Sequence, residues 1–196
     1  MKTAVISLNI APVDATIKVN GKEYQNGEYK LRPGEYKIEV TREGMTAKEF
    51  AVEAKGGSVI NVATFLVGEN NGFDFYRQKG NDESFLKLEE IAAMGNNITI
   101  DYDKSAEEFV ADYRRAYDLY MSGALPMNYA EFGEEREDGQ RSLEEITIIT
   151  NRDEECRLVL CIKAIMVGTE DKDLVESMLV ERGFNMEDYE IIYKIY

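Results

Sequence analysis

Over residues 12–66 the chain alternates apolar and polar residues with a period of two, which is the pattern of half-buried β-strands. Short alternating runs are separated by reverse-turn signals such as Asn20-Gly21, Asn26-Gly27 and Pro33-Gly34. Turn signals that recur at short, regular intervals are typical of a small antiparallel β-sandwich. The pattern therefore predicts a β domain over residues 1–68, which ends at a polar, Gly/Asn-rich joint.

Beyond this joint the hydrophobic period becomes that of an α-helix. A helix over residues 81–94 would carry Phe85, Leu88 and Ile91 on one face. A second helix is predicted to begin at Ser105 and to end before Gly123, with a stripe of tyrosines at positions 113, 117 and 120. An aromatic stripe at this spacing is more typical of a packed core than of a cofactor platform.

The remaining pattern predicts an α+β domain over residues 69–196. Residues 98–102, 145–150, 156–167 and 189–195 have the character of strands, and residues 171–182 that of a helix. The run 156–167 is apolar on both faces, so we expect it in the middle of a covered sheet. From residue 98 the order is β-α-β-β-α-β, which favours a ferredoxin-like sheet. The predicted fold class is therefore multi-domain, β + α/β, with the small antiparallel β-sandwich first.

Part of the β domain also resembles a known family. Pro12-Val13-Asp14-Ala15 leads through an alternating strand into the Asn20-Gly21 turn, which resembles the opening of a PEGA domain. In residues 31–40 a turn glycine is followed by an aromatic residue and an alternating strand, which resembles the second hallmark of that family. The Thr-Pro that commonly follows the first hairpin is replaced by Asn26-Gly27-Glu28. The resemblance implies an envelope or cell-surface module without a common enzymatic activity.

The charge of the chain is unevenly placed. Residues 1–68 hold 9 Lys/Arg and 8 Asp/Glu, whereas residues 69–196 hold 14 and 30, so nets of +1 and −16 make up the total of −15. Nucleic acid is disfavoured as a partner, because phosphate binding needs clustered cations. A basic protein partner, bound Ca²⁺ or solubility alone would each explain the acidity of the second domain.

The sequence also bears on location. It contains no run of 18 or more apolar residues, so no membrane span is predicted. The first ten residues alternate like a strand and do not have the pattern of a signal peptide. We expect an extracytoplasmic protein, secreted or membrane-anchored with its signal removed, and a cytoplasmic location is the alternative. Five steps along one strand would separate Cys156 from Cys161 by roughly 16 Å, so no disulfide between them is predicted.

Candidate chemistry is sparse. The chain has no histidine, the commonest general base near neutral pH, and its acidic pairs stand in no recognised motif. Residues 124–144 are weakly periodic and are predicted to form a long loop, a kind of segment that often carries function. The apolar residues Met127, Tyr129 and Phe132 are the candidate binding residues. They cover the core or contact a partner, and disorder of the whole segment is the third alternative. No catalytic residue, metal or cofactor is expected.

These observations favour a non-enzymatic bacterial cell-envelope or surface protein. In it a PEGA-like spacer or adhesion module would be joined to an acidic binding domain, and the partner would be a protein or a cell-wall polysaccharide. The alternative is a cytoplasmic acidic protein that binds or inhibits a basic protein partner. A hydrolase that acts through a pair of carboxylates is a further alternative.

Overall fold

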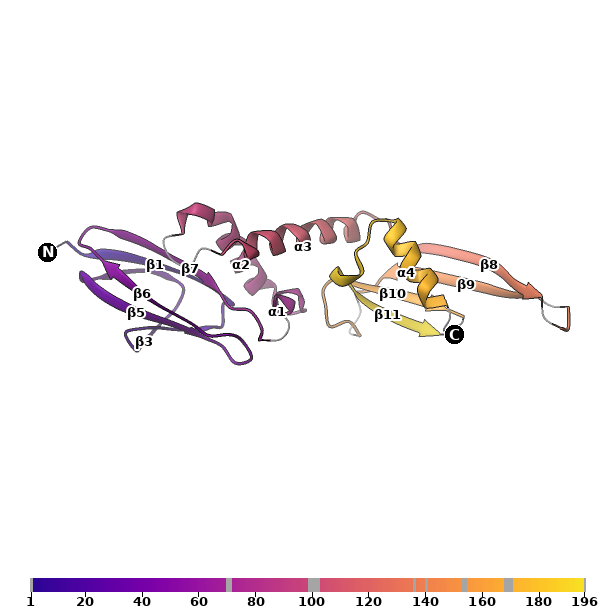
Figure 1. Cartoon of the computed structure of the whole chain (residues 1–196), viewed down its shortest axis with the longest axis horizontal. Coiled ribbons are helices and arrows are strands. Elements are labelled where there is room, and N and C mark those ends of the chain that lie inside the picture. The colour runs from indigo at the N-terminus through magenta and orange to yellow at the C-terminus, as the bar shows by residue number, and fades with distance from the viewer. Residues whose placement is uncertain are drawn as a thin grey trace. The chain divides into compact units, whose positions relative to one another are not determined.

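The computed structural model describes residues 2–69, 72–98, 103–135, 137–139, 141–152, 155–167 and 171–195 (Figure 1). The chain divides into two compact units, residues 1–111 and 112–196, and the boundary falls within helix α3 (Ser105–Met121). Several sheets combined with α-helices make the chain a β-rich mixed fold, which confirms the predicted class at this level. In the described part of the chain, no helix has the length and apolar character needed to cross a membrane.

Among the described residues of the first unit, two sheets have the strand orders β4-β1-β7 and β3-β2-β5-β6. The strands are β1 (Ala4–Ala11), β2 (Thr16–Val19), β3 (Lys22–Tyr24), β4 (Gly27–Leu31), β5 (Gly34–Thr41), β6 (Lys48–Ala54) and β7 (Val59–Phe65). The predicted alternation is confirmed, since β1 buries Ala4, Ile6 and Leu8. Asn20 and Gly21, with φ of 49° and 78°, make the tight turn between β2 and β3. Left-handed backbone at two successive positions is what a type I′ hairpin requires.

The first unit is not wholly antiparallel, contrary to prediction. β1 pairs in parallel with β7, from Val5 opposite Val59 to Ala11 opposite Phe65. These are the first and last strands of the unit, and the chain runs in the same direction along both of them. One hydrophobic core is shared by strands of both sheets, for example β1, β5 and β7.

Two helices pack on the first unit rather than on the second. They are α1 (Asp74–Arg77) and α2 (Asp82–Met94), which is followed by the 3₁₀ turn η1 (Gly95–Asn97). The predicted helix over residues 81–94 is confirmed, and α2 buries Phe85, Leu88 and Ile91 beside β1 and β7 (Figure 1). The backbone N–H of Val13 donates to Ser84 Oγ at 3.2 Å. The compact unit therefore extends past the predicted joint at residue 68, because the apolar face of α2 is buried against it.

In the second unit, the strands that the structure describes form a sheet with the order β11-β10-β9-β8. Its elements are β8 (Met127–Glu135), β9 (Arg141–Thr150), β10 (Cys161–Met166), α4 (Lys172–Glu181), the 3₁₀ turn η3 (Met186–Asp188) and β11 (Glu190–Ile195). β8, β9 and β10 are antiparallel neighbours, and α4 connects β10 to the parallel strand β11. α4 buries Val175 and Leu179, as its sequence pattern predicts.

The strand order differs from the ferredoxin-like prediction. In a ferredoxin-like sheet, each β-α-β unit is split by a strand that lies between its two parallel strands. Here β10 pairs directly with β11. The prediction also missed β8, which occupies one edge of the sheet. The predicted strand at 98–102 lies outside the described residues, apart from Ile98.

The prediction that the two cysteines remain unbridged is wrong. It assumed an extended strand from Cys156, but β10 begins only at Cys161, and residues 155–160 form turns and bends. The chain therefore folds back, so that the Cα atoms of Cys156 and Cys161 lie 6.1 Å apart and a disulfide joins the two residues. Both cysteines are buried, with 4% and 0% of their surface exposed.

The tyrosine stripe of α3 belongs to the core, as predicted. Tyr113 and Tyr120 are buried, and Tyr117 is half-buried. The Tyr120 hydroxyl donates to the carbonyl oxygen of Cys161 at 2.9 Å, at the start of β10. The Tyr189 hydroxyl donates to the carbonyl of Ala116 at 2.9 Å, which ties α3 to the start of β11. Buried hydroxyls with partners of this kind anchor the helix instead of presenting a ligand surface.

Candidate functional site

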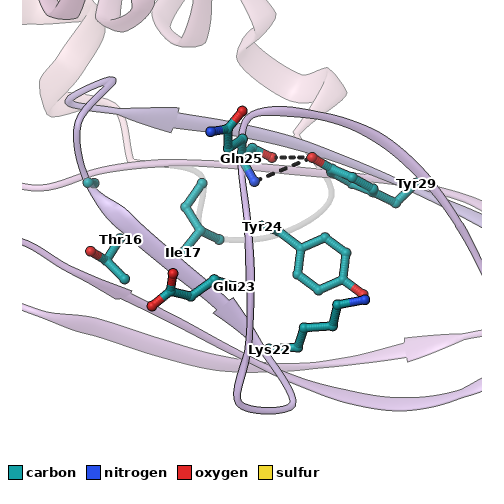
Figure 2. Close-up of a pocket in the computed structure, with 8 residues that line it drawn as sticks. Thr16, Ile17, Lys22, Glu23, Tyr24, Gln25 and Tyr29 are labelled. Carbon is teal, nitrogen blue, oxygen red and sulfur yellow. Dashed lines mark hydrogen bonds between the residues drawn. The ribbon is translucent and has the colours of Figure 1, made fainter.

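A hollow of about 640 Å³ opens on the first unit, between the edge strand β3 of one sheet and the edge strand β4 of the other (Figure 2). Two other hollows are smaller, at about 470 Å³ and about 360 Å³. Residues of β2, β3, β4 and their connections line the larger one: Ala15, Thr16, Ile17, Lys22, Glu23, Tyr24, Gln25 and Tyr29. We refer to it as the tyrosine hollow.

Two tyrosine rings form the aromatic part of the hollow. The centroids of Tyr24 and Tyr29 lie 4.8 Å apart and the ring planes cross at 84°, an edge-to-face arrangement. Both residues are half-buried and pack against the core of the unit. Tyr24 also lies opposite the buried Ile17 in the pairing of β2 with β3. The rings are therefore held in place by the core beneath them, although part of each remains accessible.

Polar contacts fix the connection between the two rings. The Tyr29 hydroxyl donates to the carbonyl oxygen of Gln25 at 2.9 Å and accepts from the backbone N–H of Gln25 at 3.3 Å (Figure 2). The ammonium group of Lys22 lies over the Tyr24 ring, 5.5 Å from its centroid. Such a position is favourable because the face of an aromatic ring is electronegative.

Asn26 anchors the same connection to the interior of the unit. Its Nδ2 donates to the carbonyl oxygen of Ile10 at 2.8 Å, and the backbone N–H of Ile10 donates to Asn26 Oδ1 at 2.7 Å. Ile10 is fully buried, so both of its backbone polar groups obtain the partners that burial demands. The sequence identified Asn26 only as a turn residue. In the structure, its side chain also sets the position of the β3–β4 connection.

The rim of the hollow is polar and mixed in charge. Thr16, Lys22, Glu23 and Gln25 are all exposed there, so that one ammonium and one carboxylate offset each other. Among the described residues, no group of three or more His, Cys, Asp or Glu is placed to hold a metal ion.

The residues proposed from the sequence lie elsewhere, in the second unit. The segment 124–144 is not a long loop, because β8 and β9 occupy most of it as an antiparallel pair. Met127 is buried, with 3% of its surface exposed, and lies opposite Ile148. Tyr129 is half-buried opposite Ile146. Phe132 pairs with Leu143 along the strand, and its side chain lies outside the described part of the structure.

Sequence reasoning missed the two tyrosines of the hollow. Tyr24 and Tyr29 flank the turn signal Asn26-Gly27, and the sequence pattern assigned no role to either residue. The signal that could have indicated them is a pair of aromatic residues on either side of a turn that joins two edge strands. That signal needs the strand order, which local periodicity does not provide.

Comparisons with known proteins do not assign a function to the tyrosine hollow. No protein-family model and no curated protein matches the chain. One similar solved structure is a candidate membrane-associated protein of unknown function from Bacteroides fragilis NCTC 9343. It is 11% identical, with a TM-score of 0.33 over 76% of this chain and 60% of that protein, so the chain matches less than two thirds of its length. A likeness of this size supports no argument about function.

Proposed function

We propose that the chain is a non-enzymatic extracytoplasmic protein of the bacterial envelope or surface, which holds a ligand in the tyrosine hollow. The hollow itself is the observation that carries the proposal. Two tyrosines stand on the core and polar side chains surround them, which is the usual composition of a ligand site. The first unit would act as a divergent PEGA-like module. The Asn20-Gly21 hairpin and the strand β5 that begins at Gly34 support this reading.

The disulfide supports the extracytoplasmic part of the proposal. Disulfides form and persist in oxidising compartments and are rare in the reducing cytosol. Cys156 and Cys161 are joined, and both are buried, which shields the bond from soluble thiols. The proposed location therefore rests on a feature that the sequence analysis had excluded.

Retention on isolated bacterial envelope material tests the proposal. The full chain is mixed with washed envelope fractions, and bound protein is quantified for the wild type and for the double variant Tyr24→Leu/Tyr29→Leu. Leucine keeps apolar packing but removes both rings. We expect the wild type to be retained and the double variant to be lost to the supernatant.

Tyr36→Leu is the matched control. The Tyr36 hydroxyl donates to the carbonyl oxygen four residues earlier, that of Arg32, at 2.7 Å, just as Tyr29 does to Gln25. Tyr36 is also half-buried against the same core but lies outside the hollow. This variant should be retained like the wild type. Equal retention of all three proteins would remove the hollow as the binding site.

The charge of the second unit favours a second candidate function, the binding of a basic protein. Residues 112–196 hold 10 Lys/Arg and 20 Asp/Glu, a net of −10. Attraction between exposed charges is screened by salt, so binding of a basic partner should weaken steeply between about 0.05 M and about 0.5 M salt. An affinity that stays constant over this range would remove this candidate.

A further inference from the structure

We infer that the ligand of the tyrosine hollow is a neutral oligosaccharide, which packs on Tyr24 and Tyr29 and hydrogen-bonds to the polar rim. This inference rests on the binding role proposed above for the same hollow. It names the class of ligand from three properties of the site: the perpendicular rings, the composition of the rim and the shortness of the neighbouring edge strand.

The rings suit the shape of a sugar. A pyranose ring exposes C–H groups on its faces and hydroxyl groups around its edge, so it needs an apolar wall beside polar partners. Tyr24 and Tyr29 supply such apolar surface, because both line the hollow, their planes cross at 84° and part of each residue remains accessible. Tyrosine combines an apolar body with a polar tip, which fits a ligand that is itself partly apolar and partly polar.

The rim matches hydroxyl groups better than it matches a charged ligand. A sugar hydroxyl both donates and accepts hydrogen bonds. Lys22 donates, Glu23 accepts, and the side chains of Thr16 and Gln25 can do both. The single ammonium and the single carboxylate leave no excess of charge to attract an anion or a cation. A neutral ligand with many hydroxyl groups can hydrogen-bond to all four side chains, and it adds no charge to the balanced pair of Lys22 and Glu23.

An extended peptide is less well served by the same surface. Peptides that add to a sheet edge bind chiefly through backbone hydrogen bonds along the edge strand. The edge strand β3 has only three residues, and the backbone N–H and carbonyl of the next residue, Gln25, already bond to the Tyr29 hydroxyl. The β3 edge therefore offers a peptide few free backbone groups. This difference favours the saccharide.

Isothermal titration of the full chain tests the inference. The neutral probes are cellohexaose, maltohexaose, xylohexaose and chitohexaose, the anionic probe is a hexamer of galacturonic acid, and an unstructured polar dodecapeptide represents the other class. We expect at least one neutral hexasaccharide to bind and to be recovered uncleaved. Tyr24→Leu should weaken that binding by about tenfold, since a well-placed aromatic contact contributes that much. Tyr36→Leu should bind like the wild type, and circular dichroism checks that both variants fold.

The outcomes separate this inference from the proposed function. If the peptide binds in a Tyr24-dependent manner and no saccharide does, the ligand class is overturned while the binding role of the hollow stands. Selective binding of the anionic hexamer would likewise overturn the claim of neutrality alone. Saccharide binding that is insensitive to both Tyr24→Leu and Tyr29→Leu overturns the site. If no probe binds, although envelope retention depends on the tyrosines, the saccharide assignment is overturned.

Discussion

Removal of the Cys156–Cys161 disulfide is expected to destabilise the second unit by about 2 kcal/mol. The estimate follows from the loop that the bond closes, which is short because the two cysteines are five positions apart. Closing a loop of about six residues removes about 7 cal/mol/K of entropy from the unfolded chain, or about 2 kcal/mol at 25 °C. The variant Cys156→Ala/Cys161→Ala removes the bond, and alanine leaves little side chain to repack at these buried positions.

The bond also holds the segment that precedes β10. Within it, the backbone N–H of Leu158 donates to Glu190 Oε2 at 2.6 Å, at the start of β11. Loss of the disulfide should loosen this contact between the β9–β10 connection and the last strand. For a unit of this size, about 2 kcal/mol corresponds to a fall in Tm of roughly 8 to 16 °C. The first unit should not change.

Differential scanning calorimetry of the full chain provides the assay. The wild type is measured after oxidative folding and again after it has been unfolded and refolded in a reductant, which gives the thiols access to the buried bond, and the double alanine variant after the same two treatments. We expect the second unit to unfold at the same Tm in the reduced wild type and in the variant, and this Tm should be lower than in the oxidised wild type. The reductant should not change the Tm of the variant. The reasoning is refuted if the reductant leaves the wild-type Tm unchanged. Two alkylatable thiols in protein folded under oxidising conditions would also contradict it.

Three further predictions concern individual side chains. Burial, aided by neighbouring carboxylates, raises the pKa of Tyr189 and of Tyr193 to about 12. Because the unfolded hydroxyls ionise near pH 10, their stabilisation should be complete below about pH 10 and lost as the pH rises to about 12. Urea unfolding measured across this range should show the fall, Tyr193→Phe should reduce it, and a flat profile would contradict it. Leu88→Ala should lower the stability of the first unit, followed by its thermal transition, by about 2–5 kcal/mol. A loss of stability confined to the transition of the second unit would contradict the packing of α2 on the first unit. Asn26→Ala should cost about 1–3 kcal/mol in urea unfolding, because both backbone groups of Ile10 lose their partner, and an unchanged midpoint would show that these bonds contribute nothing.

Local periodicity predicted most of the elements. The alternating runs of the first 68 residues became strands, and the helices α2 and α4 lie within two residues of the ends predicted. These signals are local, since each records which side chains of one segment face the core. The same signal failed for β8, where Met127 and Tyr129 alternate but a run of acidic residues follows. The segment is a strand because it pairs with β9, and its own sequence pattern does not show this pairing.

Features that depend on where the chain turns and on how its strands pair were not predictable in this way. The disulfide forms because the chain turns between its cysteines, whereas the pattern of apolar residues suggested one extended strand. Tyr24 and Tyr29 meet because β3 and β4 lie at the edges of two different sheets. The first unit likewise extends past residue 68 to residue 111, and α2 packs on its strands β1 and β7. Composition and turn signals alone do not show which residues come into contact through such turns and strand pairings.

The most direct test of the tyrosine hollow as a saccharide site is an NMR titration of the full, ¹⁵N-labelled chain with a neutral hexasaccharide. The amide signals of Thr16, Tyr24 and Gln25, three residues that line the hollow, report on binding there. The account predicts that these signals shift progressively and saturate together, while the signals of residues 112–196 stay in place. Shifts confined to residues 112–196, or none at all up to millimolar saccharide, would contradict it.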